Sequence, residues 1–220
     1  MTTDKSDIND INIINSWPGD QFASWKTPTR IAYARENPKL QNDKWGFEVD
    51  SKVISYSWTK LLLDENAAEG EHDDPALSEM AGPGMLHLPD FRDAPGVCED
   101  FLAEVYKHVS RKLRQEMTDL TFDNTPMECW ITLPAIWSDE AQDSTLEAAK
   151  NAGFGNRIGD EVWTITEPEA AAIATLKEYS MRGNMNPIQV CIALSILHEQ
   201  LLTSLARRKY LDMRLRWRNR

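Results

Sequence analysis

Two segments of this 220-residue chain carry residue types that could bind ions or phosphate. Residues 64–74 hold six acids, no base and His72, and carboxylates together with an imidazole are able to hold a cation. Their spacing matches no known metal-binding loop. The sequence therefore favours a solvated surface loop over a cation site, and we expect no metal.

The second segment, residues 153–159, places three glycines at a spacing similar to that of a nucleotide-binding loop. A dinucleotide loop follows a strand and opens a helix, because the helix N-terminus holds the phosphates. Residues 153–159 have the reverse context, since they follow an expected helix and precede an expected strand. We therefore predict that they end a helix and bind no nucleotide.

The three cysteines are far apart and form no C-x-x-C pair: Cys98, Cys129 and Cys191. This pattern argues against a disulfide framework and against a zinc site. The first residues lack the basic segment and apolar run of a signal peptide. The most apolar stretch, 188–206, is too polar for a membrane span. Together these features predict a cytoplasmic protein.

Composition predicts a globular domain, with 41% hydrophobic and 27% charged residues. A wholly disordered chain is excluded. The net charge of -11 argues against general nucleic-acid binding, which needs a surplus of Lys and Arg. Residues 207–220 nevertheless sum to +6, which leaves -17 on residues 1–206.

The first half of the chain predicts short strands and one long helix. An apolar stripe at three- and four-residue spacing indicates an amphipathic helix over 97–117, with His108 beside the stripe as a packing residue. Residues 1–10 are predicted to form a mobile tail. We also expect strands at 11–15, 31–34 and 45–49, a turn at 17–19 and a helical turn at 58–63.

The second half alternates strands and helices. A strand over 127–134 is followed by a helix that Ser138 caps and Gly153 ends. A strand over 162–166 then leads into a helix over 167–179. Such alternation predicts an α/β layer with parallel strands.

Three short motifs in this half carry a family resemblance. Leu133-Pro134-Ala135 ends the first strand, Ala152-Gly153 ends the helix, and Thr166-Glu-Pro-Glu-Ala-Ala-Ala172 ends the second strand. In order and spacing they resemble the seventy-kilodalton heat-shock chaperone family, in its divergent branch. Weaker similarity lies upstream, at Trp17-Pro-Gly, at 29–33 and at 57–64.

The resemblance implies an actin-like ATPase fold of the ribonuclease H-like type. Residues 11–180 would form part of its first lobe, with 57–120 as an inserted helical subdomain and an incomplete sheet. Residues 181–220 would be an unrelated apolar and then basic tail.

The resemblance also implies ATP and magnesium as cofactors, and roles for three residues. Glu167 is similar to the carboxylate that orients metal-bound water, and Lys60 to the lysine that stabilises the transferred phosphate. Pro134 is similar to the proline that relays nucleotide state between lobes. From the residues alone, Glu167 would be a helix cap and Lys60 a solvated head group.

The family's two phosphate-binding hairpins, D-x-G-T-T and D-x-G-G-G-T, do not occur in these 220 residues, which contain no adjacent glycine pair. Close backbone approach to phosphate needs glycine conformations. We therefore expect a truncated ATPase-family protein that does not hydrolyse ATP. Because the missing strands would leave sheet edges unpaired, we also expect a marginal or partner-dependent fold.

Two functions from different classes follow. The first is a heat-shock chaperone-like, nucleotide-binding protein. The alternative is a non-enzymatic pseudo-ATPase fragment that acts by protein–protein contact, or a gene-model fragment without function. Membrane or nucleic-acid association through the basic tail has the weakest support.

The tail after residue 182 has two interpretations. It could be an amphipathic basic helix that touches acidic membranes or the acidic surface of another protein. It could also come from a shifted reading frame or a retained intervening sequence, which the abrupt end of the family likeness favours.

Overall fold

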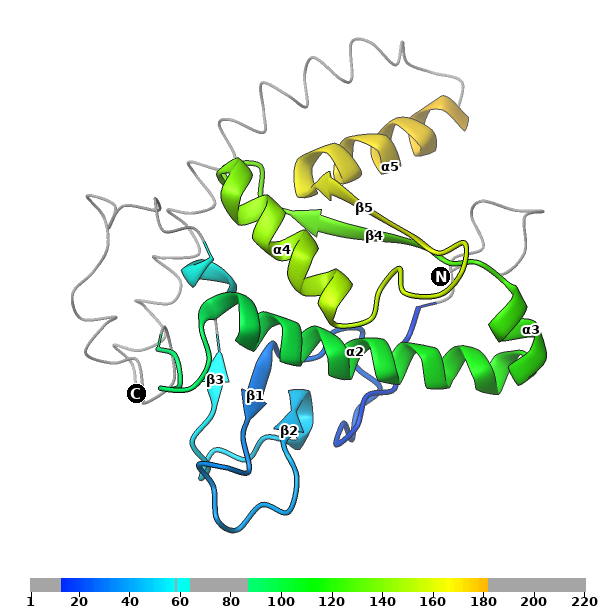
Figure 1. Ribbon diagram of the computed structural model, residues 1–220. Helices are drawn as coiled ribbons and strands as arrows, with labels where there is room; N and C mark the ends of the chain where they lie inside the picture. Colours follow the sequence, from blue (N-terminus) through cyan, green and yellow to red (C-terminus); the bar gives the residue numbers. More distant parts are fainter. Residues whose placement is uncertain (1–12, 58, 64–86, 182–220) are drawn as a thin grey trace. The chain divides into compact units, whose positions relative to one another are not determined.

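The computed structural model describes residues 13–57, 59–63 and 87–181 and has a mixed α/β fold (Figure 1). The chain divides into two compact units, one of residues 1–131 and 137–163, the other of 132–136 and the residues from 164 onward. Within the described residues, no helix is both long and apolar enough to cross a membrane. The elements are β1 (Arg30–Ala32), β2 (Lys44–Trp45), η1 (Gly46–Glu48), β3 (Tyr56–Ser57), η2 (Thr59–Leu62), α2 (Ala94–Glu116), α3 (Asp119–Asn124), β4 (Glu128–Leu133), α4 (Asp139–Asn151), β5 (Glu161–Thr166) and α5 (Glu167–Met181).

The N-terminal strands form an antiparallel sheet in the order β2-β1-β3. Ile31 on β1 is paired with Trp45 on one side and Tyr56 on the other. The strand predicted at 45–49 ends at Trp45, because Gly46 has a φ of 58° and turns the chain into η1.

The structure corrects one more N-terminal element. Residues 13–15, the described part of the strand predicted at 11–15, lie in no strand. The turn predicted after it does form, since the Asp20 N–H donates to the Trp17 carbonyl at 3.1 Å. Gly19 supplies the positive φ of 77° that this turn requires.

Helix α2 lies between the N-terminal sheet and α4 (Figure 1). It begins earlier than the predicted helix over 97–117, because the Asp93 carboxylate accepts a hydrogen bond from the Gly96 N–H at 2.9 Å and caps it. Val97 is 1% exposed and packs with Ile31 and Tyr33 of the sheet. The predicted long amphipathic helix is thus confirmed.

His108 on α2 has the packing role that the sequence predicted. Its ring stacks on Trp17, with 5.2 Å between ring centroids, and the residue is 4% exposed. Arg111 donates to His108 Nδ1 at 3.1 Å, so the proton lies on Nε2, which donates to the Ser16 carbonyl at 2.8 Å. Burial lowers the pKa of His108, and Arg111 and Lys112 lower it further.

The predicted order of strand, helix, strand and helix in the second half is confirmed. Strands β4 and β5 pair in parallel, as Figure 1 shows. The Ser138 hydroxyl accepts from the Ala141 N–H at 3.3 Å and caps α4, and Gly153, with a φ of 114°, follows its C-terminal end. The core here joins α2, α4 and both strands; it contains Ala149, Ala152, Phe154, Leu102, Ala103, Val105, Tyr106, Cys129, Ile131 and Val162.

An arginine–aspartate pair holds the start of β4 against the loop before β5. The Asp160 side chain, which is 0% exposed, accepts from the Met127 N–H at 2.7 Å and from Arg157 Nε at 2.9 Å. The Arg157 guanidinium lies 4.2 Å from the centroid of the Phe122 ring and donates to the Phe122 and Thr125 carbonyls. The pair therefore also anchors α3, a helix that the sequence did not predict.

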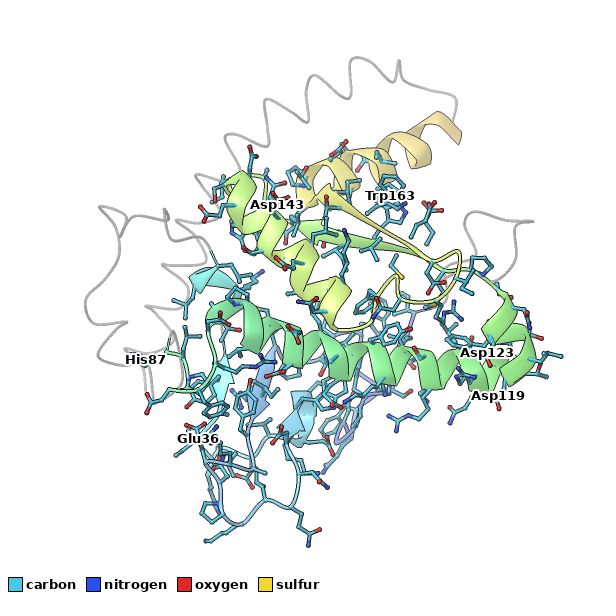
Figure 2. All side chains as sticks on the ribbon, in the orientation of Figure 1. Glu36, His87, Asp119, Asp123, Asp143 and Trp163 are labelled. Atoms are coloured by element: carbon cyan, nitrogen blue, oxygen red, sulfur yellow. The ribbon has the colours of Figure 1, made fainter. Side chains whose placement is uncertain are left out.

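We expect Asp160→Asn to lower the free energy of unfolding by about 2 kcal/mol, because the buried Asp160 carboxylate loses its charge-assisted hydrogen bonds to the half-buried Arg157 and to the Met127 N–H. Urea denaturation would measure this as a lower midpoint at an unchanged m-value. Asp119→Asn is the matched control: Asp119 also pairs with an arginine, Arg114, but its side chain is 80% exposed (Figure 2). Equal effects of the two substitutions would contradict the buried pair's role.

The buried His108 side chain should make the free energy of unfolding depend on pH. Its folded pKa lies below the ordinary value of 6.5, so the unfolded chain binds the proton first as pH falls. The stabilisation is complete above about pH 6.5 and is lost as pH decreases from there toward the folded pKa. Urea midpoints between pH 7.5 and 5.5 should fall in the native chain and fall less in His108→Gln. His87→Gln, at an exposed histidine, should leave the slope unchanged.

Candidate functional site

The candidate site lies at the carboxyl ends of β4 and β5. Because the strands are parallel, these ends meet at one edge of the sheet, where ligands bind in α/β folds. Pro134 follows β4 directly, and Glu167 follows β5 as the first residue of α5. Both residues belong to the same compact unit. The fold thus places two of the three predicted residues at a common edge.

Thr166, rather than Glu167, caps α5. The Thr166 hydroxyl accepts a hydrogen bond from the Glu169 N–H at 3.3 Å. Glu167 and Glu169 are exposed acids in the first turn, where a negative charge is favourable near the positive end of the helix dipole. This gives Glu167 a structural role that requires no ligand.

Lys60, the third predicted residue, belongs to the other compact unit. It is exposed on η2, close to Cys98 of α2, whose sulfur lies 3.7 Å from the Thr59 hydroxyl. Burial raises the pKa of the Cys98 thiol, and the Thr59 hydrogen bond and the Lys60 charge offset only part of this rise. Burial also raises the pKa of Cys129. Both thiols are therefore poor nucleophiles at neutral pH.

Residues 153–159 form the helix-ending turn that the sequence predicted. The Gly153 N–H donates to the Lys150 carbonyl at 3.0 Å, and the Phe154 N–H to Ala149 at 3.1 Å. The Asn156 N–H donates back to Gly153 at 3.3 Å. These donors complete the C-terminal end of α4 and do not point at a ligand.

Beside this turn the surface forms an open hollow of about 350 Å³, lined by Lys150, Phe154, Gly155, Asn156, Asp160, Glu161, Val162 and Trp163. No three His, Cys, Asp or Glu side chains in the described part of the chain are arranged to hold a metal ion. The acidic segment 64–74 and its His72 lie outside the described residues.

One surface feature was missed by the sequence reasoning. Trp130 on β4 and Trp163 on β5 stack on the exposed side of the sheet, with 6.0 Å between ring centroids and 24° between planes. Each indole N–H donates to the glutamate two residues earlier on its own strand, Glu128 or Glu161. We call these four residues the aromatic face. The repeated E-x-W pattern, placed on two parallel strands, could have revealed it.

No known protein family model and no curated protein matches this chain. The likeness to the heat-shock chaperone family therefore depends on short motifs of the sequence: the three around Pro134, Gly153 and Glu167, and the weaker matches upstream.

We expect Thr166→Ala to destabilise α5 by about 1 kcal/mol, because the Glu169 N–H loses its acceptor. Faster amide hydrogen exchange at residues 170–175 would measure this. Thr166→Ser keeps the hydroxyl and should exchange at the native rate. Glu167→Gln removes a charge but not the cap, so α5 should persist; equal loss of protection in Glu167→Gln and Thr166→Ala would contradict the capping assignment.

Proposed function

We propose that the chain is a divergent member of the seventy-kilodalton heat-shock chaperone family. It carries part of an actin-like ATPase lobe that does not hydrolyse ATP by itself and acts through protein–protein contact. The observation that supports this most is the carboxyl edge of β4 and β5. Pro134 and Glu167, the two residues that match the family motifs there, follow neighbouring parallel strands.

The element order adds support, because β4, α4, β5 and α5 follow one another as the motif order requires. Ala152-Gly153, the third motif, lies at the end of α4 between the two strands. A chance match of short motifs would not have to coincide with the ends of three successive elements.

The described residues do not fit a bound ATP–magnesium complex. A phosphate cradle needs unpaired backbone N–H groups on glycines, and no glycine occurs in 132–136 or 164–172 at the candidate edge. The glycines of 153–159 lie in the turn after α4, where the N–H groups of Gly153, Phe154 and Asn156 already donate to carbonyls of the chain. Hydrolysis would thus require phosphate-binding elements other than those described.

A lobe that does not hydrolyse ATP would act by binding other proteins. The aromatic face favours a contact role, because Trp130 is 53% and Trp163 47% exposed. Tryptophan is among the residues most enriched in binding hot spots. The protein–protein function is thus supported by a specific surface.

Calorimetric titration of the whole chain with ATP and magnesium is expected to show no micromolar binding, and a phosphate-release assay no hydrolysis. The control titration replaces ATP with magnesium alone. Micromolar ATP binding that Glu167→Gln abolishes would contradict the proposed loss of the nucleotide site.

Glu169→Gln is the matched variant for that outcome, because Glu169 is the other exposed acid in the first turn of α5. Loss of binding in both variants would indicate a general effect of charge at the helix start. Loss in Glu167→Gln alone would assign the carboxylate the role that the family resemblance implies.

A further inference from the structure

The aromatic face combines two kinds of group that recognise an arginine side chain, and all four of its residues lie in one compact unit. Trp130 and Trp163 stack with 6.0 Å between ring centroids, and about half of each residue is exposed. Exposed indole rings attract a guanidinium through their π-systems. The Glu128 and Glu161 carboxylates are exposed beside the rings and carry the opposite charge to a guanidinium.

The indole–carboxylate hydrogen bonds place each carboxylate at the edge of its ring. Trp130 donates its indole N–H to Glu128 at 2.8 Å, and Trp163 donates to Glu161 at 3.2 Å. A carboxylate has about four acceptor positions, so each glutamate keeps positions for the N–H groups of a guanidinium. One arginine can therefore lie on a ring and also bond the adjacent carboxylate. Because the four side chains are already bonded in pairs, they lose little conformational entropy on binding.

The two strands carry negative charge that the described part of the chain does not neutralise. Strand β4 reads ECWITL and β5 reads EVWTIT, so each has one acid and no base. Neither Glu128 nor Glu161 forms an ion pair with a lysine or arginine of the described residues. Arg157, in the loop before β5, pairs with Asp160, and Lys150 lines the hollow beside the face. The face therefore presents two carboxylates to a cation from outside.

Elsewhere in the chain an aromatic ring and two carboxylates already hold an arginine in this way. The Arg114 guanidinium lies 4.3 Å from the centroid of the Phe122 ring. It also pairs with Asp119 at 3.0 Å and with Asp123 at 2.6 Å. Indole attracts a cation more strongly than the phenyl ring of phenylalanine does. The combination on the aromatic face is therefore at least as well suited to an arginine.

We propose that the aromatic face binds an arginine-bearing segment of a partner protein. The inference rests on the contact role proposed above and names the chemistry of the partner. Arginine is favoured over lysine, because a planar guanidinium stacks on aromatic rings and bonds a carboxylate through two parallel N–H groups, whereas an ammonium is a strongly hydrated point charge. Two arginines at alternate positions of an extended segment point to the same side, about 7 Å apart. This spacing is close to the 6.0 Å between the ring centroids, so one guanidinium would serve each ring.

The first test is an NMR titration of the whole isotope-labelled chain that follows the indole N–H signals of Trp130 and Trp163. The probe is the peptide Gly-Ser-Arg-Gly-Arg-Ser-Gly, at about 150 mM salt so that non-specific charge attraction is screened. We expect both signals to shift and saturate, because the carboxylates that accept these N–H groups would also bond the arginines. The same peptide with lysine at both positions should bind about tenfold more weakly.

Trp25 is the internal control, because it is 73% exposed and lies outside the aromatic face. Its indole signal should not move. Equal shifts of Trp25 and the face would overturn the proposal, since any exposed indole would then suffice. Equal affinity for the lysine peptide would overturn it as well, since charge alone would then explain the binding. A titration in which the signals of Trp130 and Trp163 do not shift would have the same consequence.

Two double variants separate the contributions of the carboxylates and the rings. Glu128→Gln with Glu161→Gln keeps an acceptor for each indole N–H but removes the charges, so the arginine peptide should bind about fivefold more weakly. Trp130→Thr with Trp163→Thr removes the rings and retains a residue that is favourable in strands, and binding should weaken about tenfold. Native affinity in both variants would contradict the assignment of the site.

Glu140→Gln with Glu147→Gln is the matched control, since it removes the same charge from exposed positions of α4. It should bind the arginine peptide as tightly as the native chain does. An equal loss in this variant and in Glu128→Gln with Glu161→Gln would overturn the proposal, because charge anywhere on the chain would then suffice. These outcomes decide the chemistry of the partner only, whereas the ATP titration tests the proposed function separately.

Discussion

The packing of α2 against α4 determines where the rest of the larger compact unit can lie. The contact face of α4 consists of small residues: Ala141, Ala148 and Ala149 are 0–2% exposed. Such side chains let two helices approach closely, and the space is filled from the α2 side by longer residues such as Tyr106. Gly153 completes this fit, since a Cβ there would lie 2.9 Å from the Tyr106 ring. The helix pair then leaves one side of β4 and β5 covered and the other exposed.

The parts of the fold that the sequence predicted well are those with local signals. Ser138 and Gly153 mark both ends of α4, and alternating apolar residues mark β5. The wrong or missing predictions concern elements that depend on the backbone conformation of one residue or on a contact with a residue far away in the sequence. Gly46 ends β2 through its positive φ, and the six-residue α3 depends on an arginine from the loop before β5. Neither cause can be recognised from periodicity.

The position of Pro134 and Glu167 at one edge of the sheet could also be predicted from local signals in the sequence. Once two strands are parallel, the residues that follow them share one edge, so the order of elements alone groups Pro134 with Glu167. Lys60 has no such constraint, because it lies on the short helix η2. The aromatic face was missed since Trp130 and Trp163 are far apart in sequence. Only the relative register of β4 and β5 brings their rings to stacking distance.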